Sequence, residues 1–377
     1  MTTLASNLPA RRTGKLHRLD RRWWLLFGAF IAGGIFEVID NILGLRQLNF
    51  ESSAPAFVKV AKEAAILWLL LGLVRRNGLP KLTAFGFTIL SIVLVCVLGV
   101  LLSPPPTSHA QAGLIYYLVS LGMMLATCAL IRPADSEDFA RNFMLPVIVT
   151  ILVTQGLEIA LAPASLFNET NLFGLDRRAG IAAIPTTAGM LGVVGFATLR
   201  GWLPRLLSLA VIGLASSSIS LICVAIVWMS RTRHPVYALL AFPLVAAIAA
   251  VAIASRAGLD ISVTTRLDIL ADSVQQLALV GPSEIGSLAT AKSVALNPMD
   301  SFIVDSMYLE ALHVFGLIPG TLLLAAMFAT IYRRIGGMAM TLFALAGIGY
   351  LALEAWIVWF ALLFAFQRPD EVSSGPR

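Results

Sequence analysis

The apolar run that decides the topology of this chain occupies residues 206–230 and reads LLSLAVIGLASSSISLICVAIVWMS. Its length suits a single membrane-spanning helix, which needs about 20 apolar residues. Its middle, however, is a serine cluster at Ser216, Ser217, Ser218 and Ser220. Serine side chains compete for backbone hydrogen bonds and can end a helix where protein covers the freed backbone. We therefore predict two short helices with a break at the serine cluster.

The composition of the whole chain excludes a soluble protein. Of the 377 residues, 58% are apolar and 13% are charged, and the mean hydropathy is +0.86. Soluble domains carry about 25% charged residues, and even large folds bury only about three quarters of the surface that their chains expose. Disordered, collagen-like, coiled-coil and disulfide-scaffold proteins are excluded on the same grounds. We predict an all-α polytopic membrane protein.

The apolar runs give the predicted spans and domain organisation. They lie near 23–45, 57–74, 82–102, 112–131, 143–163, 181–199, 206–230, 236–254, 306–332 and 336–366. With the break in 206–230 the chain has about eleven transmembrane helices. The range is 10–12, because an unbroken helix there gives ten and a second helix in the last run gives twelve. The predicted organisation is a cytoplasmic basic tail at 1–22, one transmembrane domain at 23–366 with external loops at 164–180 and 255–305, and a C-terminal tail at 367–377.

Basic residues set the predicted orientation. The first span follows a basic tail and is longer than the apolar core of about 7–15 residues in a cleavable signal peptide. Arg231, Arg233, Arg333 and Arg334 lie at span ends, where positive charge favours the cytoplasmic side. The long loop at 255–305 is net acidic, and the broken helix places it outside, whereas an unbroken helix places it in the cytoplasm. The net charge of +6 thus reflects topology and does not predict a nucleic-acid partner.

The three cysteines do not predict a disulfide or a metal site. Cys96, Cys128 and Cys223 all lie inside apolar runs, and the chain has no CxxC or HxxxH spacing. A cysteine in such a place usually packs as a small hydrophobic side chain. We expect no metal.

Four arginines flank the predicted external loops. Arg177 and Arg178 precede the run at 181–199, while Arg256 and Arg266 follow the run at 236–254. A guanidinium binds phosphate oxygens through two parallel hydrogen bonds and stays charged, so this set suits a diphosphate. The alternative is that the arginines anchor span ends at the membrane interface. Anchoring explains Arg266 least well, because this residue lies within a polar segment.

Three segments of the chain resemble the bacterial O-antigen polymerase and ligase superfamily, which contains the Wzy-type polymerases and the WaaL-type ligases. The segments are Arg177-Arg178-Ala-Gly180-Ile-Ala-Ala-Ile-Pro185, then Arg266 with Gly281 and Gly286, and then Asp305-Ser-Met-Tyr308-Leu with Gly316-Leu-Ile-Pro-Gly320. They are similar to the arginine–glycine–proline start of a span, the loop arginine, and the span that follows the large loop in that family. Ligases often carry a histidine where Asp305 stands, so the resemblance favours a polymerase and leaves a ligase open.

The resemblance implies an architecture, a reaction and partners. It implies a GT-C-like glycosyltransferase in the bacterial inner membrane, with a cytoplasmic N-terminus and a periplasmic long loop. The donor would be an oligosaccharide repeat unit on undecaprenyl diphosphate, and the acceptor would be a sugar hydroxyl of another unit. No cofactor is implied. Membrane lipid, a chain-length regulator and a flippase of the same pathway are the other expected partners.

The same resemblance suggests roles for individual residues. Asp305 is the first candidate for the general base, and its alternative role is the N-cap of the span at 306–332. Arg266, with Arg177, Arg178 and Arg256, would stabilise the leaving diphosphate. The secondary candidates are Tyr308, Glu158 and His313.

Two other function classes remain open. A transporter or a flippase of polysaccharide precursors would use ionisable groups inside the membrane, and the candidates are Glu37, Asp40, Glu158 and Glu354. A non-catalytic subunit of a polysaccharide export complex is the third class. Neither class requires a long external loop flanked by arginines.

Overall fold

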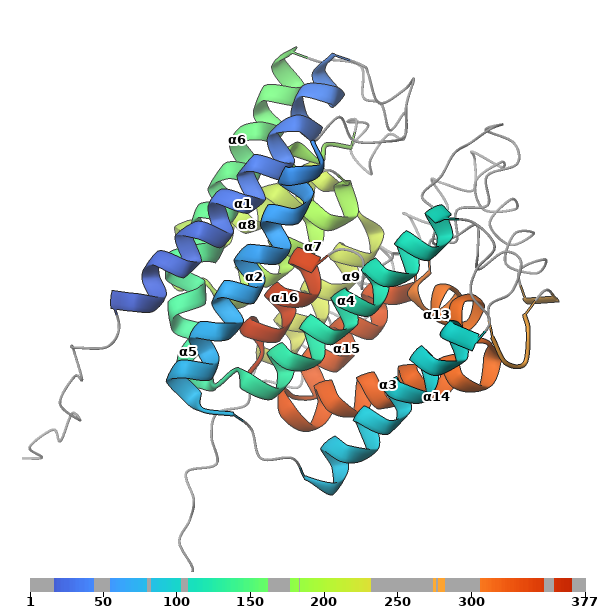
Figure 1. The fold of residues 1–377 in the computed structure, drawn as a ribbon. Helices are drawn as coiled ribbons and strands as arrows, with labels where there is room; N and C mark the ends of the chain where they lie inside the picture. Colours follow the sequence, from blue (N-terminus) through green and yellow to red (C-terminus); the bar gives the residue numbers. More distant parts are fainter. Residues whose placement is uncertain are drawn as a thin grey trace, which may run out of the picture.

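A computed structural model describes most of the chain as a bundle of helices (Figure 1). The described residues are 17–43, 55–79, 83–102, 108–161, 177–182, 184–231, 274–275, 277–281, 306–348 and 356–367. Within these ranges the regular elements are all helical, as the composition predicts. They are α1 (His17–Ile42), α2 (Ala56–Asn77), α3 (Ala84–Leu102), α4 (Ser108–Leu130), α5 (Pro133–Phe139), the π-helical turn η2 (Ala140–Met144), α6 (Leu145–Leu161), the 3-10 turn η3 (Gly180–Ala182), α7 (Pro185–Thr198), α8 (Trp202–Ala215), α9 (Ser218–Arg231), α13 (Met307–Phe315), α14 (Leu317–Arg334), α15 (Gly337–Ile348) and α16 (Trp356–Ala365).

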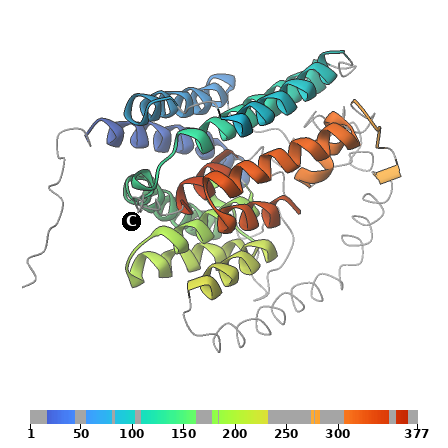
Figure 2. The same ribbon diagram turned by 90° about the horizontal axis from the view of Figure 1, so that it is seen from below.

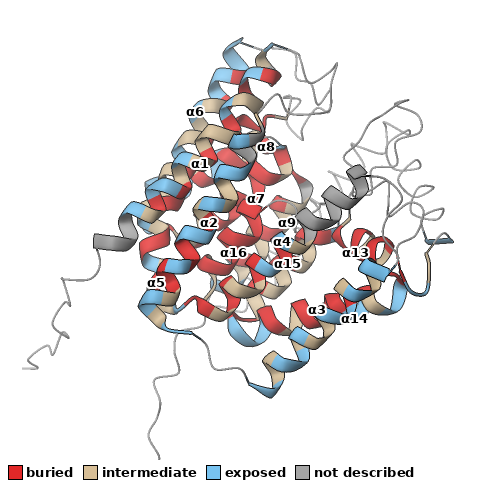
Figure 3. Cartoon of the chain, in the orientation of Figure 1, coloured by how far each residue is buried: buried red, intermediate tan, exposed pale blue. Residues whose placement is uncertain are grey.

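Two helices in these ranges are long and apolar enough to cross a membrane. They are Arg21–Asp40 within α1 and Asp135–Leu161, which runs from α5 through η2 into α6. Exposed large apolar side chains also lie on α1, α2, α3 and α6, whose residues are a mixture of exposed, intermediate and buried in Figure 3. Exposed apolar surface of this extent marks contact with another apolar phase or partner.

The helices are arranged around α16. From below, α1–α4 lie on one side of the bundle and α7–α9 on the other, with α15 and α16 between them (Figure 2). α16 contacts both α4 and α7, and its side chains from Trp356 to Phe364 are all buried. A helix that is apolar on every face belongs in the interior. Trp23 of α1 packs on this helix at Phe360 and Phe364.

The serine cluster breaks the run at 206–230 as predicted. α8 ends at Ala215, α9 begins at Ser218, and Ser216 between them has a left-handed backbone with φ of 45°. The hydroxyl of Ser216 donates a hydrogen bond to the carbonyl of Gly213 at 2.7 Å. This bond satisfies one of the last carbonyls of α8, which have no partner within the helix.

α8 and α9 run in opposite directions along α7. Along α8, Ser208 lies beside Gly195 near the end of α7, and the later residue Ile212 lies beside the earlier Gly192. Ser220, in the first turn of α9, lies beside Gly189 near the start of α7. At the end of α9, the guanidinium of Arg231 donates hydrogen bonds to the carbonyls of Phe196 and Ala197. The chain therefore returns at Arg231 to the end of the bundle where α8 began.

The single helix predicted at 306–332 is wrong. α13 ends at Phe315, Gly316 adopts φ of 89°, and α14 starts at Leu317. The amides of Leu317 and Ile318 donate to the carbonyls of residues 278 and 279, at 2.8 and 3.1 Å. A Cβ on Gly316 would lie 2.7 Å from the Cα of Val280. The break thus depends on a segment from the long loop, which the local pattern does not reveal.

The last apolar run contains the additional helix that its length allowed. α15 ends at Ile348 and α16 begins at Trp356. Glu354, the acid expected near this point, lies outside the described residues. The three cysteines are free and buried, as predicted.

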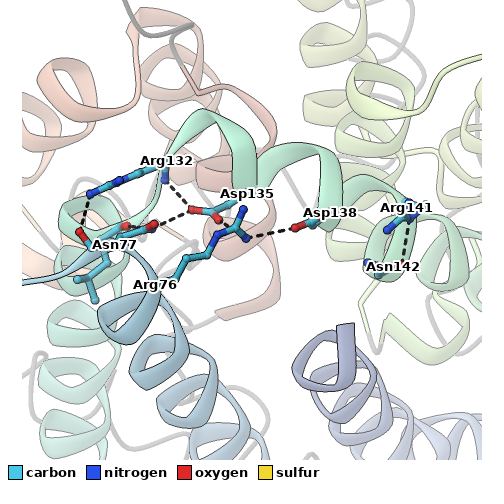
Figure 4. A network of polar contacts seen from close by, with 8 residues as sticks. Arg76, Asn77, Arg132, Asp135, Asp138, Arg141 and Asn142 are labelled. Carbon is cyan, nitrogen blue, oxygen red and sulfur yellow. Dashed lines mark hydrogen bonds and ion pairs between the residues drawn. The ribbon is translucent and has the colours of Figure 1, made fainter. Parts of the chain in front are cut away.

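A polar network joins the end of α2 to the junction of α4 and α5 (Figure 4). The carboxylate of Asp135 accepts hydrogen bonds from the backbone amide of Arg132 at 2.9 Å and from Nδ2 of Asn77 at 3.2 Å. It also forms an ion pair with Arg76 at 3.0 Å, and Arg76 reaches Asp138 at 3.3 Å. Asp135 is buried, so its carboxylate depends on these partners for stability.

We expect Asp135→Ala to lower the free energy of unfolding by about 3 kcal/mol, because removing one partner of a buried charge pair leaves the others unsatisfied. Glu137→Ala is the matched control. Glu137 is two residues away and its ion pair with Arg200 is exposed on both sides, which predicts a loss below about 1 kcal/mol. Melting of both variants in detergent measures the difference. Equal losses would contradict a stabilising role for the buried network.

Candidate active site

Basic side chains divide unevenly between the two ends of the bundle. α1, α3 and α5 begin at one end of the bundle, where α2, α4 and α14 end, along the lower left and bottom of Figure 1. α8 begins and α9 ends beside the end of α7, at the same end of the bundle. We call this the arginine end. The basic side chains described there are Arg21, Arg22, Arg75, Arg76, Arg132, Arg141, Arg200, Arg205, Arg231, Arg333 and Arg334. Toward the opposite end, the described basic side chains are Lys62, Arg177 and Arg178.

The segment 177–182 connects the predicted arginine pair to α7. Arg178 is 6% exposed, while Arg177 is half-buried. α7 begins at Pro185, in the first helical position, where a proline loses no helical hydrogen bond. The arginine–glycine–proline pattern therefore marks the start of this helix, as expected from the sequence.

The end of α8 holds one side of this segment. The amide of Arg178 donates to the carbonyl of Leu214 at 3.0 Å, and Nε of Arg177 donates to the carbonyl of Ala215 at 3.4 Å. These carbonyls belong to the last turn of α8, the negative end of the helix dipole, which favours a nearby cation. The serine break therefore also shapes the site, because it ends α8 beside the two arginines.

α6 holds the other side. Nε2 of Gln155 donates to the carbonyl of Arg178 at 2.9 Å, and Nη1 of Arg178 lies 3.4 Å from the carbonyl of Glu158. The carboxylate of Glu158 accepts the amide of Gly180 at 3.0 Å. Both α6 side chains are buried. Glu158, predicted as a secondary site residue, thus lies directly beside Arg178.

Gly180 and Gly34 permit this close packing. Gly180 has φ of 56°, and a Cβ there would lie 2.6 Å from Oγ1 of Thr154 and 2.9 Å from the carbonyl of Ile151. On the other side of the segment, a Cβ on Gly34 of α1 would overlap the carbonyl of Ile181. The segment therefore has no room to shift toward either helix.

α1 brings further carboxylates to this end of the bundle. Its last turns contact η3 and α6, and they carry Glu37 and Asp40 one turn apart. Asp40 is 2% exposed, and Glu37 is half-buried. Ionisable residues this far inside a helical bundle are usually functional.

The remaining predicted residues fall into two groups. Asp305, Arg256 and Arg266 lie outside the described residues. Tyr308 lies on α13, where its hydroxyl donates to the carbonyl of Ala344 at 2.8 Å and its ring stacks on Phe328. These contacts give Tyr308 a packing role. The N-cap of α13 is Ser306, the residue after the predicted cap.

His313 is fully buried on α13, and it shares a face with Glu310, which is 1% exposed. The two residues are one turn apart, so their side chains neighbour each other on the helix surface. Glu310 is not among the site residues predicted from the sequence. The sequence nevertheless contains a signal for Glu310, because an acidic residue within an apolar run, three positions before a histidine, is unusual.

Comparisons with protein-family models, with curated proteins and with solved structures give no match to this chain. Its function is therefore argued from the site.

Proposed function

We propose that this protein is an inner-membrane polymerase of lipid-linked oligosaccharide repeat units, with a GT-C-like architecture. It would transfer a glycan from undecaprenyl diphosphate to a sugar hydroxyl of an acceptor unit, using no nucleotide sugar. The observation that carries the proposal is the adjacent pair Arg177 and Arg178, held between α6 and the last turn of α8. The pair lies on the opposite side of the bundle from the arginine end.

The burial of Arg178 favours a diphosphate over the anchoring alternative. An interfacial anchor buries the carbon stem of the arginine and keeps the guanidinium in water. Arg178 is 6% exposed, and its guanidinium reaches back to α6. Glu158 and the carbonyls of α6 and α8 hold Arg178 in place before any substrate binds, and a cation held in place beforehand is suited to stabilise a leaving anion.

The proposed step is a substitution at the anomeric carbon of the donor sugar. The acceptor oxygen forms the new glycosidic bond as the bond to the diphosphate oxygen breaks. The lipid diphosphate leaves with the electron pair, and Arg177 and Arg178 stabilise its developing charge. The acceptor proton passes to a base, and Asp305 remains our candidate for it.

The arginine end supports the proposed orientation. Exposed aromatic side chains accompany its arginines, and they include Trp24, Trp202 and Tyr332. Tryptophan and tyrosine gather at membrane interfaces, and arginine gathers on the cytoplasmic side. This pattern supports a membrane protein whose arginine end faces the cytoplasm and whose Arg178 site faces the periplasm, where the lipid-linked substrate would be polymerised.

Incubating the purified protein with a synthetic lipid-linked repeat unit tests the proposal. We expect a ladder of products spaced by one repeat unit, because each transfer adds one unit to a growing glycan. Arg200→Lys, at the exposed arginine end, is the control that should give the same ladder. Transfer restricted to a lipid A core acceptor would indicate a ligase, and no product with either acceptor would contradict glycosyl transfer.

A carrier of polysaccharide precursors is the second candidate, favoured by the buried carboxylates of Asp40, Glu158 and Glu310. Acids inside a membrane domain often bind the coupling proton or the substrate. Proteoliposomes loaded with a lipid-linked unit distinguish the candidates, because a carrier moves the unit between leaflets without lengthening it.

A further inference from the structure

The polar side chains on α6 form a single surface against the segment 177–182. Thr154, Gln155 and Glu158, which we call the α6 triplet, occupy positions i, i+1 and i+4 of a mostly apolar helix. Glu158 is a helix-surface neighbour of both Thr154, four residues before it, and Gln155, three residues before it. Oγ1 of Thr154 accepts the amide of Ile181 at 2.9 Å. The triplet therefore directs three side chains at three successive parts of one short segment.

The triplet replaces the hydrogen bonds that secondary structure would otherwise supply. The carbonyl of Arg178 binds Gln155, the amide of Gly180 binds Glu158, and the amide of Ile181 binds Thr154. The segment is buried from Arg178 to Ala182, and buried backbone groups without partners are costly. The apolar helix thus carries polar residues at the positions where the segment needs partners.

We propose that Thr154, Gln155 and Glu158 are positioning residues that fix the backbone of the segment 177–182, which we call the arginine segment. Arg177 and Arg178 are then oriented to bind a diphosphate before it arrives. This inference rests on the proposed function. It changes the role of Glu158 from a secondary site candidate to a hydrogen-bond acceptor for the backbone. Charge-stabilising groups held in place before the reaction do not have to reorganise during it.

The opposite side of the segment explains why fixing the backbone also fixes the arginines. The last carbonyls of α8 accept hydrogen bonds from the amide of Arg178 and Nε of Arg177. α1 packs against Ile181 at Gly34 so closely that a Cβ there would overlap Ile181. With both sides occupied, the segment has one backbone path. The two guanidinium groups then start from fixed Cα positions, which limits how far they can move apart.

Paired substitutions at two positions test the proposal. Thr154→Val and Glu158→Leu remove an acceptor, while Thr154→Ser and Glu158→Gln keep an oxygen in the same place. Leu157→Ala is the control, because Leu157 lies on α6 but is 45% exposed and faces away from the segment. The measurements are amide hydrogen exchange of a peptide covering 177–182 and calorimetric binding of inorganic diphosphate to the purified protein.

We expect Thr154→Val and Glu158→Leu to speed exchange in the segment by about tenfold or more, since an orphaned buried amide opens more readily. Diphosphate affinity should fall by about tenfold in the same variants. Thr154→Ser, Glu158→Gln and Leu157→Ala should stay within about threefold of the parent protein in both measurements.

Unchanged exchange in Thr154→Val and Glu158→Leu would overturn the positioning role. Faster exchange with unchanged diphosphate affinity would overturn the link between the backbone and the arginines. If the parent protein itself does not bind diphosphate, the proposed function fails, and the exchange comparison still decides whether the triplet fixes the segment.

Discussion

Replacing Arg178 with lysine is expected to leave the protein in the membrane and to stop polymer formation. Lysine keeps the positive charge but loses the planar pair of donors that binds two phosphate oxygens at once. Loss of one preorganised charge-stabilising donor typically lowers a rate on the order of 10²–10³-fold. Unpolymerised lipid-linked repeat units should accumulate, and their amount relative to polymer measures the effect.

Membrane level is the first control for this prediction, and Arg200→Lys, which alters an exposed arginine at the other end, is the second. If Arg177 and Arg178 stabilise the same diphosphate, the rate loss of a double substitution should be smaller than the product of the single losses. Polymer of normal amount and length from Arg178→Lys, at matched protein level, would rule out bidentate binding of the diphosphate by Arg178.

Gly34→Ala should lower the stability of the protein substantially. The added Cβ would overlap the carbonyl of Ile181 and its side chain, so α1 or the arginine segment must move. Overpacking of this kind costs about 1–3 kcal/mol. Here the obstructing atom belongs to backbone, which places the expected loss near the upper limit. Thermal melting in detergent measures it.

Gly28→Ala is the matched control for this prediction, because Gly28 lies on the same helix with no atom within 4 Å of its Cβ position. Alanine favours a helix over glycine by about 1 kcal/mol. We therefore expect Gly28→Ala to melt at or above the melting temperature of the parent protein. Gly34→Ala should melt below that temperature. Equal melting of the two variants would contradict close packing at Gly34.

Local patterns predicted several features of the fold correctly. The serine cluster ends α8, where the hydroxyl of Ser216 bonds to the nearby carbonyl of Gly213. Pro185 starts α7, where a missing amide hydrogen costs no helical hydrogen bond. Both effects are local. The break at Gly316 was missed because its stabilising partners are the carbonyls of residues 278 and 279, from another part of the chain. A glycine inside an apolar run predicts a break only when the segment that packs against it is known.

The candidate site shows the same division. Arg178 and Glu158 were singled out individually, but their contact depends on a fold that brings α6 beside the segment 177–182. Thr154 and Gln155 were not singled out, because uncharged polar residues are common in membrane helices. Their spacing with Glu158 was the available signal, and it gained meaning only once their common target was known.

The antiparallel pair α8 and α9 has a consequence for biogenesis. Each helix has 14 residues and is about 21 Å long, whereas the hydrocarbon layer is about 30 Å thick. In the membrane orientation proposed above, neither helix alone is long enough to cross this layer. We therefore expect the nascent chain to insert both together, docked on α7, whose Gly189, Gly192 and Gly195 leave space for them. In a ribosome-stalled chain that ends inside α9, the residues of α8 should then remain accessible from water.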